Sequence, residues 1–528
     1  MNLTDFSFLC SFAVILVIYY LVPRKFRWGV ILVSSIAYYL LSGHPLLVLY
    51  PLISIAITYV CTRLMASDKH KKASFIAGIV LLLLVLISLK YMKFIWSGSL
   101  AEGVSPSPFV SVMLLVPLGL SYYTFTLIGY MVDVYNGIAK VQMNFFKLLT
   151  FGMYAPVLVS GPILQYREIS GDFFAEHNFD LRQITFGMQR MLWGFFKKLV
   201  IAERLGVMVS TVYDDPVTYS GGYVWLGILC FTIQLYSDFS GLMDIVLGIS
   251  QCLGFKLPEN FNTPFFAKTV AEYWRRWHIT LGVWFKEYLF YPILRTSLHR
   301  NIQNKLKAAY AKKGDEKKAK KRSKQISTYI AMFVLWLIIG LWHGGNMTFV
   351  IGSGLLHWFY IVMEEVLEPV FKKLWEKIKV NPDGKVLNAL RILRTFILVN
   401  IGNAFFRAPS VGAAFKLLGC GLGIGTSGST AEGLIGSFVT AVSSNGIRAV
   451  QEIGPLGLTY TDMVVLAFSI LILLIVDIMK TKTDVRKSIA AQPIVIRYII
   501  WLALLFYVIL MGQYGPGYDA AAFIYQGF

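Results

Sequence analysis

The chain of 528 residues is 56% hydrophobic and only 15% charged, and its mean hydropathy is +0.62. Soluble domains carry roughly 25% charged residues, so the composition excludes an ordinary water-soluble globular protein. The apolar residues form runs near the length of about 20 residues that a bilayer-crossing helix needs, without the period-two alternation of a membrane barrel. We therefore predict an all-α polytopic membrane protein with roughly 11–13 transmembrane helices, among them 145–165 and 185–210.

The net charge of +20 does not indicate a nucleic-acid partner. Lys and Arg gather in short segments beside apolar runs, which is the pattern of cytoplasmic loops in membrane proteins. Membrane lipids are therefore the expected surroundings. The five cysteines show no paired spacing, so the sequence predicts neither a disulfide framework nor a metal site.

The first apolar run, near 6–22, precedes a basic cluster of Arg24, Lys25 and Arg27. A cleavable signal peptide has the opposite order. We therefore expect this run to be retained as a span, with residues 24–27 in the cytoplasm. It opens a block of N-terminal transmembrane helices over 1–116, which we expect to be followed by a core over 117–410.

Two segments of the core break the pattern of apolar spans. Residues 268–298 mix aromatic side chains with Arg275, Arg276 and His278, so we expect a re-entrant or interfacial element sheltered inside the protein. Residues 300–325 hold eleven Lys or Arg against two acids, and we predict a basic, mobile cytoplasmic loop. Attraction to anionic lipid and recruitment of a polyanionic donor are both open as roles for it.

Counting spans forward from that loop predicts an extracytoplasmic Gly/Ser-rich loop over 411–459 and C-terminal helices near 460–479 and 494–512. The tail 513–528 then lies outside. Gly423, Gly425 and Gly428 spell a dinucleotide fingerprint, but the strand and helix that give the motif its meaning are missing from the pattern. No permanently bound cofactor is expected.

Two histidines stand in unusual surroundings. His343 ends an apolar run against Gly344 and Gly345, and His278 lies in the mixed aromatic and basic segment. An ionisable group at membrane depth is a functional-site candidate, and imidazole can exchange a proton near neutral pH. Hydrogen bonding between packed helices is the structural alternative for both, and more so for His357 on the next apolar run.

Acidic residues also occur inside an apolar run, at Asp238 and Asp244. We expect them to pair with Arg275 or Arg276 as a buried ionic support, since one half of such a pair is costly to leave alone. A structural role is favoured over a catalytic one.

Six stretches make the chain resemble the membrane-bound O-acyltransferase family, in particular its bacterial alginate-O-acetylation-like branch. In order they are PLGLSYYTF (117–125), SGPILQYRE (160–168), DFSGLMDI (238–245), EYWRRWHITLGVWFKEYLFYPI (272–293), GLWHGGNMTFVIGSGLLH (340–357) and FFRAPS (405–410). The combination of W-R-R-W-H-I-T-L with G-L-W-H-G is the specific part of the match.

The resemblance implies a ring of tilted helices around a central tunnel that joins a cytoplasmic donor to an outside acceptor. It implies that His343 is the essential histidine and that His278 lies near the same cavity. The donor would be an acyl thioester, acetyl coenzyme A first, used as a co-substrate. The acceptor would be a polysaccharide outside the bacterial plasma membrane, reached through a separate extracytoplasmic esterase-like partner.

The sequence given ends in F-x-Y-x-x-F, centred on Tyr525. In the related teichoic-acid D-alanylation system a similar ending belongs to a small protein whose tyrosine is implicated as an acyl relay, so Tyr525 is a third candidate catalytic residue. An aromatic interfacial anchor is the alternative. For the whole chain we predict acyl transfer across the membrane, with His343 as general base. D-alanyl transfer to teichoic acid and a non-enzymatic transporter or export scaffold are the rival hypotheses.

Overall fold

The computed structural model describes residues 2–67, 69–97, 115–311, 315–425, 434–445 and 450–514. Over these ranges the chain forms helices and two isolated β-bridges, with no strand. Eight helical stretches are long and apolar enough to cross a membrane: Pro45–Leu64, Lys71–Tyr91, Gly222–Cys252, Glu316–Trp342, Met347–Lys377, Lys385–Arg407, Tyr460–Lys480 and Ile494–Met511. The protein is an all-α polytopic membrane protein, as predicted.

The eight stretches are fewer than the predicted 11–13 spans because several apolar runs are broken into shorter helices. Phe6–Leu21, Phe145–Ser160 and Val411–Gly421 are apolar but short. The run 145–165 is divided by the turn before Pro156 and ends near Gly161. The run 185–210 becomes α10 (Leu181–Phe195), a π-helical stretch and α11 (Glu203–Asp214). The ring and tunnel that the resemblance implies stay predictions.

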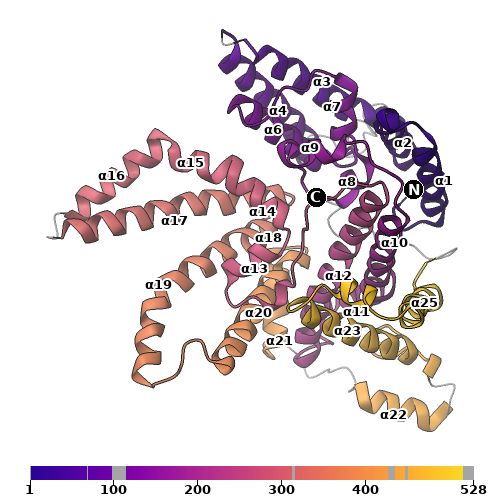
Figure 1. Ribbon diagram of the computed structural model, residues 1–528. Coiled ribbons are helices and arrows are strands. Elements are labelled where there is room, and N and C mark those ends of the chain that lie inside the picture. Colours follow the sequence, from indigo (N-terminus) through magenta and orange to yellow (C-terminus); the bar gives the residue numbers. More distant parts are fainter. Residues whose placement is uncertain are drawn as a thin grey trace. The chain divides into compact units, whose positions relative to one another are not determined.

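The chain forms two compact units, and the boundary between them cuts α12 (Gly222–Cys252) after Asp238. The first unit contains residues 1–195 and 239–259. Its other helices are α1 (Phe6–Leu21), α2 (Arg27–Ser42), α3 (Leu49–Leu64), α4 (Lys71–Ser97), α6 (Leu120–Tyr135), α7 (Phe145–Gly152), α8 (Ala155–Ser160), α9 (Tyr166–Phe173) and α10. These are the indigo and magenta helices of Figure 1.

The second unit contains residues 196–238 and 260–528, and it holds both candidate histidines. It begins with the π-helical turn η3 (Phe196–Ala202) and α11. Its later helices are α13 (Val270–Arg276), α14 (Ile279–Phe285), η5 (Lys286–Phe290), α15 (Tyr291–Arg295), α16 (Ser297–Ala311), α17 (Glu316–Trp342), α18 (Met347–Phe349), η6 (Val350–Leu355), α19 (Leu356–Lys377), α20 (Lys385–Arg407), α21 (Val411–Gly421), α22 (Leu434–Asn445), α23 (Tyr460–Lys480), α24 (Val485–Ala490) and α25 (Ile494–Met511).

The described residues of the basic segment 300–325 are mostly helical, and the cytoplasmic placement of this loop stays a prediction. α16 and the start of α17 run side by side as a helical hairpin (Figure 1). Asp315 caps α17 by accepting a hydrogen bond from the backbone N–H of Lys318, and Lys307 pairs with Glu316 at 3.1 Å. Lys and Arg are good helix formers, so a dense run of them does not prevent a helix. Within 411–459, α21 and α22 are likewise helical, and the extracytoplasmic placement of this region stays a prediction.

A buried ionic cluster lies at the start of the second unit. Lys198, on η3, pairs with Glu203 at 2.8 Å and with Asp238 on α12 at 2.8 Å, and all three side chains are at most 6% exposed. Charges at this depth need partners because hydrocarbon offers none. The pairing of Asp238 with Arg275 or Arg276 was therefore predicted wrongly. Arg276 instead pairs with Glu272 one helical turn away, at 2.7 Å.

Asp244 also has a different partner from the one predicted. It pairs with Arg190 at 2.8 Å, and Arg190 makes a second ion pair with Glu259 at 2.5 Å, all within the first unit. Six residues on a helix correspond to about 600° of rotation, so Asp238 and Asp244 point to different sides of α12. Each meets the cation of the element that faces it.

Replacing Asp238 with asparagine leaves buried charges without their full compensation, which typically costs about 3–5 kcal/mol. We expect D238N to lower the thermal unfolding temperature of the detergent-purified full-length protein clearly. The control is D484N, because Asp484 pairs with Lys487 at an exposed position, where ion pairs contribute about 0–1 kcal/mol. Equal shifts for the two variants, measured by intrinsic fluorescence, would contradict this assignment.

Candidate active site

His343 lies at the turn that ends α17. Its backbone N–H still donates to Ile339 within the helix, and the next two residues, Gly344 and Gly345, have φ values of 145° and 75°. Side-chain-bearing residues rarely adopt such angles, so the paired glycines allow the chain to reverse directly after the imidazole. Asn346 then accepts a hydrogen bond from the backbone N–H of Thr348 and starts α18.

The imidazole of His343 lies among aromatic rings from three helices and is 2% exposed. Its centroid lies 4.7 Å from that of Trp342, 6.3 Å from Phe349 and 5.7 Å from Phe406 on α20. Phe349 and Phe406 also contact each other edge to face at 5.0 Å. This packing fixes the ring in a water-poor environment, where electrostatic and proton-transfer interactions are stronger than in bulk water.

Close backbone packing holds the helices on either side of His343. A Cβ on Gly340 of α17 would lie 2.7 Å from Cα of Val350, and a Cβ on Gly354 would lie 2.6 Å from the carbonyl oxygen of Trp336. Small residues at such crossings let membrane helices approach closely. The sequence contains the glycines, but their role in positioning His343 becomes visible only when α17 and η6 are seen to pack together.

His278 lies at a second sharp turn, between α13 and α14. Its φ of 45° and ψ of 53° are left-handed, which is uncommon for a residue other than glycine. Such strain persists only where the surroundings fix it, and it often marks a functional position. The segment around it forms four short helices rather than one span, and the buried residues of these helices lie in the first two of them, α13 and α14.

Asn260 fixes the turn at His278 through its side chain and its backbone. Its Oδ1 lies 3.2 Å from Nδ1 of His278 and accepts hydrogen bonds from the backbone N–H and the hydroxyl of Thr280, each at 3.0 Å. Its carbonyl oxygen accepts the N–H of Ile279. Because a carbonyl oxygen only accepts, Nδ1 of His278 carries the proton and Nε2 carries the lone pair. Sequence analysis missed Asn260, which lies outside the aromatic and basic motif.

Burial in this turn lowers the pKa of His278 to about 3. The side chain is 2% exposed and therefore stays neutral through the physiological range. A neutral imidazole with a fixed tautomer is suited to accept a hydrogen bond and so to orient a hydroxyl, and it carries no positive charge.

The segments that carry the two histidines pack on each other. Trp274 of α13 meets Trp336 of α17 with ring centroids 5.0 Å apart, and Phe285 of α14 meets Trp342 at 6.3 Å. His357 of α19 lies against Trp274 at 5.0 Å and is buried at 3% exposure. His278, which starts α14, and His343, which ends α17, therefore belong to segments in direct contact, whereas His357 is packed against Trp274 and Trp336. Tyr525 lies outside the described residues.

Comparison with known proteins identifies the family of this chain. Residues 136–308 match the model of MBOAT, the membrane-bound O-acyltransferase family. The chain is 32% identical to the probable alginate O-acetylase of Pseudomonas aeruginosa, over 78% of this chain and 73% of the relative. The chain belongs to the membrane-bound O-acyltransferase family, and it is an O-acyltransferase.

Two further relatives differ in the acceptor that their names state. The peptidoglycan O-acetyltransferase of Helicobacter pylori is 29% identical over 66% of this chain and 65% of its own length. The teichoic acid D-alanyltransferase of Bacillus subtilis is 28% identical over 55% of this chain and 68% of its own length. The family resemblance that was predicted from the motifs is confirmed, while the roles of His343, His278 and Tyr525 stay predictions.

The depressed pKa of His278 predicts an acid-sensitive contribution to stability. Between pH 6.5 and about 3 the unfolded chain binds a proton at this position that the folded protein does not. The contribution of the neutral ring to the free energy of unfolding is full above pH 6.5. It declines as the pH falls and is about 2 kcal/mol smaller at pH 5. We expect H278N, whose asparagine also tolerates left-handed backbone, to lose less thermal stability than wild type between pH 7 and pH 5.

The control for this measurement is H70N, since His70 is exposed in the connection after α3. H70N should show the same decrease in unfolding temperature as wild type. If the unfolding temperatures of H278N and wild type fall in parallel with pH, the folded protein does not hold His278 neutral.

Proposed function

We propose that the chain transfers an acetyl group from cytoplasmic acetyl coenzyme A toward hydroxyls of a polysaccharide outside the bacterial cell membrane. One observation carries the proposal: a buried imidazole, His343, ends the membrane-crossing helix α17 at a turn that two glycines keep free of side chains. The names of the alginate and peptidoglycan relatives support the acetyl group and the polysaccharide acceptor.

The proposed chemical step is attack of a hydroxyl on a thioester. His343 takes the hydroxyl proton while the oxygen bonds to the thioester carbonyl carbon, forming a tetrahedral intermediate. Collapse of the intermediate breaks the carbon–sulfur bond, and the imidazolium gives its proton to the departing thiolate. The products are an ester and a free thiol, and the imidazole is restored.

His278 is proposed as the positioning residue of this site. Asn260 holds its ring in the tautomer with a lone pair on Nε2, and its neutral state leaves it able to orient a hydroxyl without repelling the imidazolium of His343. His278 would affect the rate by holding the reacting groups in position.

Tyr525 is proposed as the first acceptor. A phenol ester is activated relative to an alkyl ester, so an acetylated Tyr525 can pass its group on without a further energy source. An extracytoplasmic esterase-like partner would then take the acetyl group to the polysaccharide. D-alanyl transfer from a carrier-protein thioester is the second candidate, because of the Bacillus subtilis relative.

Replacing His343 with alanine should reduce acetyl transfer by about 10²–10⁴-fold, which is the usual contribution of a general base. The measurement is thiol released from acetyl coenzyme A by the purified protein in the presence of acceptor. H70A is the matched control, because His70 is exposed, and it should act at the wild-type rate. A folded H343A protein with full activity would contradict the proposal, and thiol release only from a D-alanyl carrier thioester would favour the second candidate.

Protein in which Tyr525 is replaced with phenylalanine should not become labelled by radioactive acetyl coenzyme A. Its thermal stability should stay unchanged, because only the hydroxyl is lost. The label is followed by denaturing gel after incubation with labelled acetyl coenzyme A. Y514F is the control, since Tyr514 follows α25 and lies eleven positions earlier. Equal labelling of Y525F and wild type would exclude Tyr525 as the relay.

A further inference from the structure

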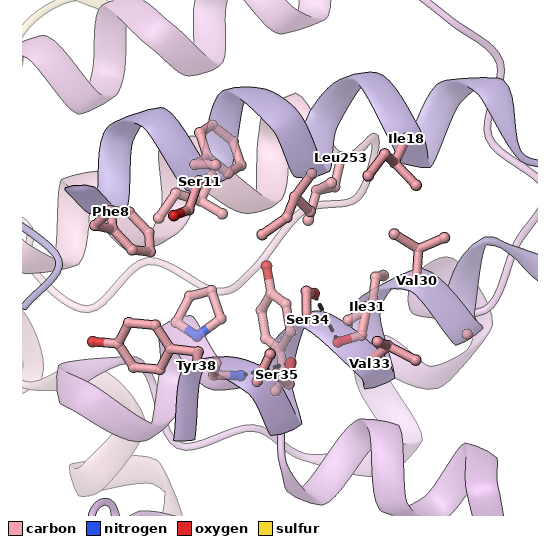
Figure 2. Close-up of a pocket in the computed structure, with 18 of the residues that line it drawn as sticks. Phe8, Ser11, Ile18, Val30, Ile31, Val33, Ser34, Ser35, Tyr38 and Leu253 are labelled. Carbon is pink, nitrogen blue, oxygen red and sulfur yellow. Dashed lines mark hydrogen bonds between the residues drawn. The ribbon is translucent and has the colours of Figure 1, made fainter. Parts of the chain in front are cut away.

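A cavity of about 670 Å³ lies between α1 and α2 in the first unit, far in sequence from the two histidines. Figure 2 shows Phe8, Ser11 and Ile18 of α1 on one side and Val30, Val33 and Tyr38 of α2 on the other, with open space between the two helices. α8 and the end of α12 complete the lining with Ala155, Pro156, Ile249 and Leu253. The volume falls within the range of about 300–1,000 Å³ that is typical of small-molecule sites.

The lining offers apolar contact and little else, because its hydroxyls are used by the protein. Ser34 donates to the carbonyl of Ile31 at 3.1 Å, and the hydroxyl of Ser35 accepts the backbone N–H of Ala155 at 3.1 Å. Ser11 donates to the carbonyl of Ser7 at 2.7 Å. An occupant therefore gains dispersion and burial of hydrocarbon rather than hydrogen bonds.

The rim of the cavity is aliphatic and exposed. Ile18, Val33 and Leu41 line the cavity and are 45%, 68% and 68% exposed. In a membrane such residues face lipid tails. An apolar groove in that position is continuous with the hydrocarbon around it, so it can accept a chain from the bilayer without exposing either surface to water.

The length of the groove matches one leaflet. Its lining on α1 extends from Phe8 to Ile18, a rise of about 15 Å at 1.5 Å per residue. The hydrocarbon core of a bilayer is about 30 Å thick, so each leaflet provides chains of about that length. A single acyl chain is the occupant that this dimension favours.

Charge distinguishes the two ends of the groove. Arg24 and Lys25 are exposed beside the end marked by Ile18 and Phe26, and Nζ of Lys25 lies 5.0 Å from the centre of the Phe26 ring. Asp5 precedes α1 at the opposite end. Exposed basic residues next to the cytoplasmic leaflet attract anionic lipid headgroups.

Arg27 does not belong to this basic group. Its guanidinium is buried and donates to the backbone carbonyls of Val22, Tyr20 and His177. Its role is to fix the turn between α1 and α2, which leaves Arg24 and Lys25 as the charges that a ligand can meet.

We propose that the α1–α2 cavity binds one acyl chain of an anionic glycerophospholipid from the cytoplasmic leaflet, with the phosphate at Arg24 and Lys25. This site is separate from acyl transfer at His343, and its test does not depend on that activity. The lipid completes the packing between α1 and α2.

Gly29 provides a direct test, because it lines the cavity and a Cβ built on it meets nothing within 4 Å, so a larger side chain has room at this position. We expect G29F to fill the groove and to reduce the phosphatidylglycerol retained by the purified full-length protein at least fivefold, measured by native mass spectrometry. V17F is the matched control, since Val17 is 60% exposed on α1 and is not part of the lining. It should retain lipid as wild type does.

The headgroup is tested with the pair R24Q and K25Q. In protein stripped by detergent and returned to phosphatidylglycerol or phosphatidylcholine, the double variant should lose at least threefold of the wild-type preference for phosphatidylglycerol. The control double variant K372Q and K373Q changes exposed lysines at the end of α19 and should keep the preference. Equal retention of both lipids by wild type would overturn the anionic assignment.

A third measurement uses the unmutated protein, so it does not depend on how G29F folds. Phosphatidylglycerol with a photoreactive group in its acyl chain should label peptides that contain 8–18 and 29–41 in excess of the other lipid-facing helices. Uniform labelling of all spans would overturn the proposal. The proposal would also be overturned if native mass spectrometry showed a wild-type dimer that G29F converts to a monomer. A second copy of the chain, and not a lipid, would then fill the cavity.

Discussion

Two helices approach each other in this protein more closely than side chains would permit, at Gly340 of α17 and Gly354 of η6. That contact sets the distance between the helix that ends in His343 and the helix that begins just after it. The rest of the candidate site follows from it, because Phe349 and Phe406 reach the imidazole only when α17, η6 and α20 lie at this separation. A Cβ at Gly352 would likewise meet Phe405, at 2.5 Å.

Polar groups impose a second constraint, since a membrane interior supplies no hydrogen-bond partners. Several buried charges in the described residues pair with groups on adjoining elements. Lys198 meets two acids, Arg190 meets Asp244 and Glu259, and the hydroxyl of Tyr236 donates to Asp477 at 2.9 Å. The π-helical turn η3 places Lys198 within this network, and π turns recur at functional positions in helices.

The class of fold and the two histidine motifs could be predicted from the sequence. Composition and run length are enough to identify membrane helices, and a histidine at the end of an apolar run is visible as a candidate before the turn around it is known. Ion-pair partners could not be predicted, because Asp238, Asp244 and Arg276 each pair with whatever element faces them. The contribution of Asn260 to the turn at His278 was equally hidden, since it comes from a residue eighteen positions away.

Helix boundaries were predicted less well than helix existence. Apolar content does not reveal where the hydrogen-bond pattern of a helix changes, so 185–210 was predicted as a single span although its α-helical pattern is interrupted by η3. In the basic segment 300–325, helical structure could not be predicted from the charge density. Its charge density favours solvent exposure, but exposure and helical structure are compatible when a cap such as Asp315 starts the helix.

α17 has 27 residues and is therefore about 40 Å long, whereas the hydrocarbon core is about 30 Å thick. Its basic beginning thus projects beyond the lipid, while its other end terminates at His343. A hydrogen-bonded helix resists compression along its axis, and the imidazole lies at the end of this one. A displacement of the projecting end along the helix axis would therefore be transmitted to His343.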